Sequence, residues 1–211
     1  MKPDKLEYRY TPAGTVGIQL EEREDGQPGK ISGYGAVFYD GSEGSQYRLW
    51  DDFVERIMPG AFDRAIREQH DTRSFFNHDA NWILGRTTAG TLGLSIDSRG
   101  LRYEISPPDT SAGRDVRESV RRKDVTGSSF MFVAQGVAWR KEEGVTIREI
   151  NDVDLWEVGP VVFPAYEGTS SELRMQSLRT LVDAERRRHA PGPTVEMELR
   201  RLALRRRQLG R

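Results

Sequence analysis

The sequence predicts an α+β fold in which β-strands predominate. Between residues 30 and 166, short runs of apolar and β-branched residues recur, and glycine or proline separates them. Many short strands at such spacing are typical of a barrel or a sandwich. After Tyr166 the pattern becomes helical and basic. We therefore expect an N-terminal arm over 1–28, a β domain over 29–172 and a basic helical tail over 173–211.

The strands are expected where apolar residues alternate or run together. In the N-terminal arm, prolines and glycines lie among charged residues, and Thr15–Leu20 alone alternates like an edge strand. In the β domain the expected strands are Ile31–Tyr39, Tyr47–Ile57, Ser74–His78, Thr91–Ile96, Leu101–Ile105, Ser129–Trp139, Val145–Ile150 and Val153–Phe163.

Two helices are expected to interrupt the strands. The first follows Pro59, with Phe62 and Ile66 four residues apart on one face. The second covers about 111–122, with Val116 and Val120 on its apolar face. In the tail, an amphipathic helix is expected before Pro191-Gly192-Pro193, and Thr194 is placed to cap a last helix.

Composition excludes several classes of protein. The 211 residues include no cysteine, so disulfides and a cysteine nucleophile are excluded, and with three histidines we expect no metal site and no cofactor. No apolar run approaches the ~20 residues that span a bilayer, so we expect no membrane contact and a cytoplasmic location.

Charge is unevenly distributed. From Arg174 to Arg211, eleven arginines face four acidic residues, 11 − 4 = +7, which leaves −1 − 7 = −8 for the remainder. Such a tail either contacts an acidic partner or is a solvated helix. We expect no nucleic-acid partner, because the body is acidic and no aromatic residue lies among the arginines.

Three motifs supply a hydroxyl, an imidazole and a carboxylate. Gly127-Ser128-Ser129 begins an apolar run, and His78 ends one, whereas His70 and His189 lie in charged segments. A serine nucleophile needs an adjacent base, and the base needs a third group that fixes its tautomer. Ser128 and Ser129 both remain candidates. Adjacent residues of a strand face opposite sides, so the choice depends on which side of the strand the base lies.

The carboxylate has three candidates. Asp79 follows His78 directly and is also placed to brace the next turn, while Asp154 and Glu157 lie in an apolar strand. By alternation, Asp154 and Trp156 face one way and Leu155 and Glu157 the other. A glutamate on an apolar face needs a partner, which is either an imidazolium or an arginine.

Taken in order, the motifs resemble the prohead (capsid maturation) serine proteases of tailed bacteriophages. From histidine to serine there are 129 − 78 = 51 residues, and from serine to glutamate 157 − 129 = 28. The resemblance covers roughly 33–166 through Gly33-Tyr34-Gly35-Ala36-Val37-Phe38, Pro59-Gly60-Ala61-Phe62, Asn77-His78-Asp79, Leu84-Gly85-Arg86, Ser129-Phe130-Met131-Phe132, Leu155-Trp156-Glu157-Val158 and Pro164-Ala165-Tyr166.

The resemblance implies a herpesvirus-assemblin-like β-barrel flanked by helices, and a serine endopeptidase. Ser129 is the implied nucleophile, His78 the general base and Glu157 the acidic third member. The implied substrates are the major capsid protein and the scaffold protein, and the enzyme itself by self-cleavage, with a homodimer as a further expectation. The implied place of action is the inside of the phage prohead, in the bacterial host cytoplasm.

Two residues depart from the family pattern. Met131 replaces a small residue, usually glycine, between two phenylalanines, and Gly159 replaces a serine. Met131 suggests an altered pocket or a weakened enzyme, and it keeps open a noncatalytic assembly module with the same barrel. Arg86 is a candidate for the oxyanion site, and the alternative is a structural ion pair.

Overall fold

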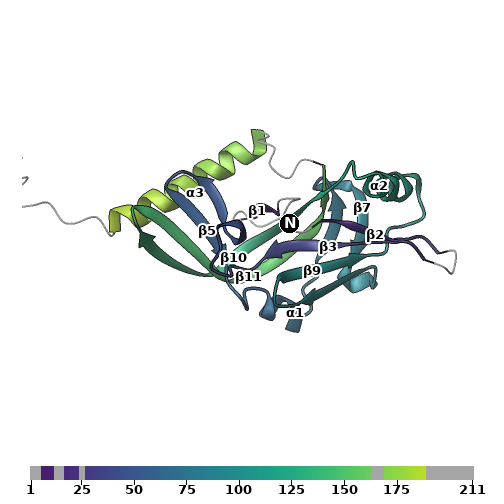
Figure 1. Cartoon of the computed structure of the whole chain (residues 1–211), viewed down its shortest axis with the longest axis horizontal. Coiled ribbons are helices and arrows are strands. Elements are labelled where there is room, and N and C mark those ends of the chain that lie inside the picture. Colours follow the sequence, from purple (N-terminus) through teal and green to yellow (C-terminus); the bar gives the residue numbers. More distant parts are fainter. Residues whose placement is uncertain (1–5, 12–16, 24–26, 163–168, 189–211) are drawn as a thin grey trace, which may run out of the picture. The chain divides into compact units, whose positions relative to one another are not determined.

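Two β-sheets make up most of the chain in the computed structural model (Figure 1). The structure describes residues 6–11, 17–23, 27–162 and 169–188. The chain divides into two units, Met1–Gly168 and Thr169–Arg211. The sheets belong to the first unit, and the second contributes α3 (Thr169–Arg188). The expected boundaries at 28 and 172 stay a prediction.

The larger sheet is built on one long hairpin. Its order is β1-β10-β11-β5-β4, and β6 pairs with both β11 and β7. The pairs are antiparallel except that β5 and β6 run parallel to β11. The strands are β1 (Glu7–Thr11), β4 (Tyr47–Trp50), β5 (Phe53–Ile57), β6 (Arg73–Phe76), β7 (Asp79–Arg86), β10 (Gly127–Glu142) and β11 (Val145–Val161).

The smaller sheet has the antiparallel order β2-β3-β9-β8. Its strands are β2 (Gln19–Glu21), β3 (Lys30–Val37), β8 (Leu92–Ile96) and β9 (Gly100–Ile105). The remaining elements of the first unit are α1 (Asp63–Arg67), α2 (Ser111–Arg121) and two single 3₁₀ turns, Glu43–Ser45 and Thr87–Ala89.

The main apolar core of the described residues joins the two sheets. Phe130 and Phe132 of β10 and Leu101 and Tyr103 of β9 are fully buried members of it. The sheets approach so closely at Gly35 of β3 that a Cβ there would lie 2.2 Å from the Val158 side chain. The odd and even residues of β10 therefore have distinct surroundings, because the even ones face this core.

Most predicted elements are confirmed, with changed boundaries. The helix expected over 111–122 is α2, and the Thr110 hydroxyl caps it by accepting from the Gly113 N–H at 3.2 Å. The expected strands Val145–Ile150 and Val153–Phe163 are one strand, β11. Strands β1 and β7 were not expected from the sequence. The Pro-Gly-Pro break and the helix after Thr194 lie outside the described residues.

Candidate active site

His78 lies in a tight turn rather than in a strand. The strand predicted over Ser74–His78 ends at Phe76, and Phe76 pairs with Asp79 across the β6–β7 hairpin. The two turn residues, Asn77 and His78, have φ of +52° and +61°. Two-residue hairpins favour this left-handed pair because its twist matches that of the strands, and asparagine and histidine tolerate it better than most residues. The turn therefore places His78 at the tip of the β6–β7 hairpin.

Asn77 fastens this turn to the end of β11. Its backbone N–H donates to the Pro160 carbonyl at 3.2 Å, and its side-chain oxygen accepts from the Val162 N–H at 2.9 Å. The turn is thus held at two points against the strand that carries Glu157. This placement brings two residues that are 79 positions apart in the sequence within reach of each other.

His78 and Glu157 form a direct pair. His78 Nδ1 lies 2.9 Å from Glu157 Oε1, and the glutamate side chain is 2% exposed. In the tautomer that donates Nδ1–H to the carboxylate, Nε2 carries the lone pair. Nε2 is buried and has no hydrogen-bond partner among the described residues. The pair therefore leaves a buried, oriented acceptor that is available to a third group.

A β-bulge places Glu157 on this side of the sheet. Met131 pairs with Glu157, but Phe132 pairs with Leu155, so Trp156 is an extra residue in β11. The expectation that Leu155 and Glu157 face the same way was wrong, because the bulge interrupts alternation. Leu155 packs in the main core, whereas Glu157 lies on the opposite face with Met131.

The two serines face opposite sides of β10. Ser128 shares the core side with Phe130, and its hydroxyl lies 2.9 Å from the Tyr103 hydroxyl of β9. Ser129 pairs with Gly159 and lies two residues from Met131, so it shares the face of Glu157. The register therefore assigns Ser129, and not Ser128, to the side on which His78 lies.

Ser129 is completely buried, and its hydroxyl is already engaged. Its Oγ donates to the Arg9 carbonyl of β1 at 3.2 Å. The described chain contains no hydrogen bond between Ser129 and His78. The structure thus joins His78 to Glu157 directly and brings Ser129 to the same face without contact to the imidazole nitrogen.

Gly159 allows the β6 backbone to lie against the serine. A Cβ at Gly159 would lie 2.6 Å from the Phe75 carbonyl oxygen and 2.7 Å from Ser74 Oγ. A serine at this position, as in the family pattern, therefore does not fit the present backbone. The departure is explained by close packing of β6 on β11 next to Ser129.

Met131 lies beside the site rather than behind it. It is buried on the same face as Ser129, in a small cluster with Leu6 and Val133, against which Tyr8 and Trp156 pack. Its side chain fills the surface next to the His78–Glu157 pair, because Met131 and Glu157 are directly opposite in the ladder. The methionine thus shapes the wall of the site.

The other candidate side chains have separate partners. The Asp79 carboxylate accepts from the Asn81 backbone and side chain, both at 2.9 Å, which braces the turn. The Asp154 carboxylate accepts from Arg64 at 2.7 Å and from Gln135 at 2.6 Å. Burial raises the pKa of Asp154, and the bonds from Arg64 and Gln135 outweigh it, so the pKa lies below its ordinary 3.8. Neither carboxylate contacts the imidazole.

Two further basic side chains are also paired elsewhere. Arg86 donates twice to Asp71, at 2.7 Å each, which fits the ion-pair interpretation. His70 Nε2 lies 3.5 Å from Glu68 Oε2 and 3.4 Å from the Arg64 guanidinium. The described residues include no group of acidic or histidine side chains that could hold a metal ion, and none of the described helices is long and apolar enough to cross a membrane.

The sequence reasoning missed the strand beside the serine. Tyr8 and Tyr10 of β1 pair with Met131 and Ser129. Their rings lie edge-on to the His78 imidazole, with centroids 4.7 and 6.0 Å away. The signal was present, because Glu7-Tyr8-Arg9-Tyr10-Thr11 alternates charged or polar residues with aromatic ones.

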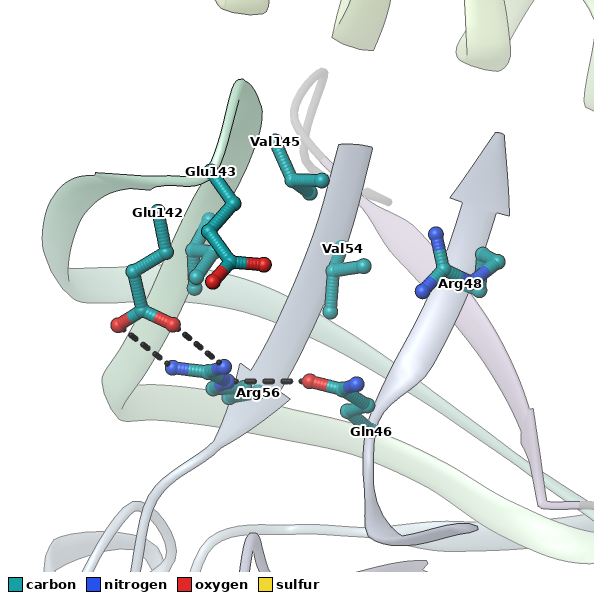
Figure 2. A pocket seen from close by; sticks show the side chains of 8 residues that line it. Gln46, Arg48, Val54, Arg56, Glu142, Glu143 and Val145 are labelled. Atoms are coloured by element: carbon teal, nitrogen blue, oxygen red, sulfur yellow. Dashed lines mark hydrogen bonds and ion pairs between the residues drawn. The ribbon is translucent and has the colours of Figure 1, made fainter. Parts of the chain in front are cut away.

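A hollow in the described surface lies away from these residues. A cavity of about 600 Å³ opens at the far end of the β10–β11 hairpin, where Arg56 binds Glu142 at 3.0 and 3.3 Å and Gln46 at 3.1 Å (Figure 2). None of the three candidate catalytic residues lines it. The cavity therefore does not mark the serine site.

Comparison with known proteins gives one family and one structure. Residues 17–183 match the family model described as caudovirus prohead serine protease. The capsid assembly protease of bacteriophage T4, gp21, is 10% identical, with a TM-score of 0.41, and the match covers 74% of this chain and 98% of that one. The search of curated proteins found no match.

Proposed function

Because the chain belongs to the caudovirus prohead serine protease family, we propose that it is an endopeptidase with Ser129 as nucleophile, His78 as general base and Glu157 as the residue that orients the base. The protein is a serine protease of capsid maturation. The family supplies the reaction class, and the three residues are our assignment.

A concentration of buried polar atoms without partners carries this assignment. Three of the four such atoms in the described chain are His78 Nε2, Glu157 Oε2 and Ser74 Oγ, and the fourth is Nε of Arg148, whose other nitrogens bind Glu7 and Glu55. Buried polar atoms without partners cost free energy and are rare in native proteins, so a group of them points to a functional site. All three belong to the face on which Ser129 lies, since Ser74 abuts Gly159, the ladder partner of Ser129.

The proposed chemistry is acyl transfer. Ser129 Oγ turns from the Arg9 carbonyl, its proton passes to His78 Nε2, and the oxygen bonds to a peptide carbonyl carbon. The imidazolium then gives the proton to the leaving amine as the C–N bond breaks. Water repeats the sequence on the acyl-enzyme and frees the serine. Glu157 stabilises the imidazolium through the Nδ1 hydrogen bond, and no cofactor takes part.

The proposed substrates are the capsid protein or its scaffolding segment, a scaffold protein, and the enzyme itself. We place the reaction inside the prohead, in the cytoplasm of the bacterial host. We also propose an assemblin-like barrel for this architecture, in which the two sheets pack closely at Gly35 and Val158. The noncatalytic module is not favoured, because the family is one of serine proteases.

Labelling with a fluorophosphonate, which bonds to an activated serine, tests the assignment. We expect wild type to be labelled and Ser129→Ala to be inert. Ser128→Ala is the matched control, because it removes the neighbouring hydroxyl from the core face, and it should still be labelled. Labelling that survives Ser129→Ala and disappears in Ser128→Ala would contradict the assignment.

A further inference from the structure

The N-terminal strand β1 covers the one edge at which a peptide could pair with β10 beside Ser129. In the described part of the sheet, β1 is the terminal strand and pairs with β10 alone (Figure 1). Its register places Tyr10 opposite Ser129 and Tyr8 opposite Met131. An uncovered strand edge offers a row of backbone donors and acceptors that binds an extended peptide.

We propose that β1 occupies the substrate-binding edge of the protease, so that the enzyme is closed until β1 leaves. The inference rests on the proposed function of Ser129. Three observations carry it: how β1 engages the serine, how it covers the histidine, and how its other face is attached. The family match begins at residue 17, so β1 lies outside the matched region.

First, β1 engages the nucleophile as an occupant and not as a substrate. Ser129 Oγ donates its proton to the carbonyl oxygen of Arg9 at 3.2 Å. Attack requires the opposite arrangement, in which the serine oxygen approaches the carbonyl carbon and other donors hold the carbonyl oxygen. The Arg9 peptide bond is therefore spared while β1 is in place, and the hydroxyl is not free for another chain.

Second, the outward side chains of β1 cover the general base. Tyr8 and Tyr10 contact the imidazole edge-on, and Ser129 has no exposed surface. A substrate carbonyl cannot reach a serine that is completely buried. A peptide that replaced β1 would place its own alternate side chains where the two tyrosines lie, against the apolar cluster of Leu6, Met131 and Val133.

Third, the inward side chains of β1 attach the strand to the body through ion pairs. Arg9 binds both Glu55 and Glu7, and Arg148 binds Glu7 at 2.6 Å and Glu55 at 2.7 Å. The four charges sum to zero. Thr11 adds a hydrogen bond from its hydroxyl to the Gly35 carbonyl at 2.6 Å. Removal of β1 takes away one negative charge, Glu7, and one positive charge, Arg9. The Arg148–Glu55 ion pair remains, so no unpaired charge of this group is left behind.

The test compares the rates of fluorophosphonate labelling at Ser129 in wild type and in three variants. Deletion of residues 1–11 removes β1. Tyr10→Pro retains the rest of the chain but removes the ring beside His78 and fixes φ near about −65°, away from the value of an extended strand, which weakens the pairing of β1. Gln19→Pro is the matched control, since Gln19 lies in β2, the edge strand of the other sheet. Circular dichroism and thermal melting verify that each variant is folded.

We expect both β1 variants to be labelled about tenfold faster than wild type or more, because removal of a dominant closed state raises the competent fraction. Gln19→Pro should match wild type. The peptide Leu6–Thr11, added in excess to the deletion variant, should slow labelling again. The same peptide with serine at both tyrosine positions should slow it much less.

Two outcomes would overturn the inference, and they differ in what they mean for the protease. If wild type and the folded variants are labelled at equal rates, Ser129 is reactive but β1 does not close the site. If no version is labelled at Ser129, the proposed function fails together with the inference. If the deletion variant does not fold, Tyr10→Pro and its control decide the question.

Discussion

At the scale of single residues, the proposed chemistry depends on one carboxylate beside one imidazole. Glu157 reaches His78 because a bulge at Trp156 turns the glutamate side chain away from the main core. The carboxylate is buried there, and one of its oxygens lies against the His78 imidazole. A buried carboxylate that fixes the tautomer of a base also stabilises the cation formed during catalysis. Asp154, three residues earlier, is bound instead by Arg64 and Gln135.

Glu157→Gln should lower the rate of peptide cleavage about 10³- to 10⁴-fold, because the amide retains the size of the side chain but not the charge. The rate of capsid-protein processing by purified enzyme measures the effect. Asp154→Asn is the control on the same strand and should retain nearly full activity. A larger loss in Asp154→Asn than in Glu157→Gln would move the acidic role to Asp154.

Gly159→Ala should destabilise the protein by about 1–3 kcal/mol, because its Cβ would meet the Phe75 carbonyl oxygen at 2.6 Å and Ser74 Oγ at 2.7 Å. Urea denaturation measures the free energy of unfolding. Gly93→Ala is the control, since the nearest atom to its Cβ would be 3.8 Å away. Equal free energies of unfolding for the two variants would show that β6 is not packed on Gly159 as described.

At the scale of elements, the β6–β7 hairpin determines where the His78 imidazole lies. Its turn needs two left-handed residues, and the Asn77 side chain ties it to Val162 at 2.9 Å. Asn77→Ala removes that bond and strains the turn, so we expect a loss of about 1–2 kcal/mol in stability and a fall in kcat. Asn77→Asp retains the acceptor and should retain most of the activity. Full activity in Asn77→Ala would show that the bond from Asn77 to Val162 is not needed to position His78 for catalysis.

The ion pairs of β1 predict a dependence of stability on pH. Burial raises the pKa of the Glu7 carboxyl, but Arg148 and Arg9 outweigh burial, so its pKa in the folded protein lies below the ordinary 4.5. Glu55, the fourth member, faces the same two arginines. A lowered folded-state pKa contributes stability that is complete above the unfolded value and lost as pH falls through the folded value.

Glu7→Gln should therefore be less stable than wild type at pH 7, and the difference should shrink as pH falls below about 4.5. Denaturant midpoints of the two proteins at pH 7, 5 and 3.5 give the comparison. Lys30→Gln is a control for the loss of an ion pair away from β1, because Lys30 binds Glu104 at 2.6 Å in the smaller sheet. A constant difference between wild type and Glu7→Gln across this range would mean that Glu7 is not held by the arginines.

At the scale of the whole molecule, the pattern of the sequence anticipated the class of fold better than the position of its parts. Period-two runs separated by glycine and proline predicted a mainly β chain, and the strands bear this out. The bulge at Trp156 could not be read from alternation, because one inserted residue leaves local composition unchanged. Strand β1 was missed because five polar and aromatic residues give a weak hydrophobic signal, although their period was visible.

In the candidate site, too, the sequence predicted the types of residue but not their arrangement. The motifs offered His78 and three carboxylates, the family resemblance selected Glu157 among these, and in the structure His78 and Glu157 lie 2.9 Å apart. Ser128 and Ser129 stayed open because choosing between them needs the register of β10 against its neighbours. That register is a property of the assembled sheet.

The basic tail leads to a prediction about assembly. Residues 174–211 carry 11 − 4 = +7 charges, which suits an acidic partner during incorporation. Deletion of residues 191–211 should lower the amount of protease found in purified proheads, measured by quantitative mass spectrometry. Replacement of the tail arginines by lysine in the full-length chain retains the charge, so this variant should be incorporated like wild type. Unchanged incorporation after the deletion would leave the tail as a solvated helix.

The role of Ser129 is tested most directly by intact masses after co-expression of the protease with the capsid protein of the same phage. Wild type and Ser128→Ala should yield discrete fragments of the capsid protein or of the protease, and Ser129→Ala should yield full-length chains alone. Full-length chains in every sample, or fragments that persist in Ser129→Ala, would contradict the claim that Ser129 is the nucleophile of a working protease.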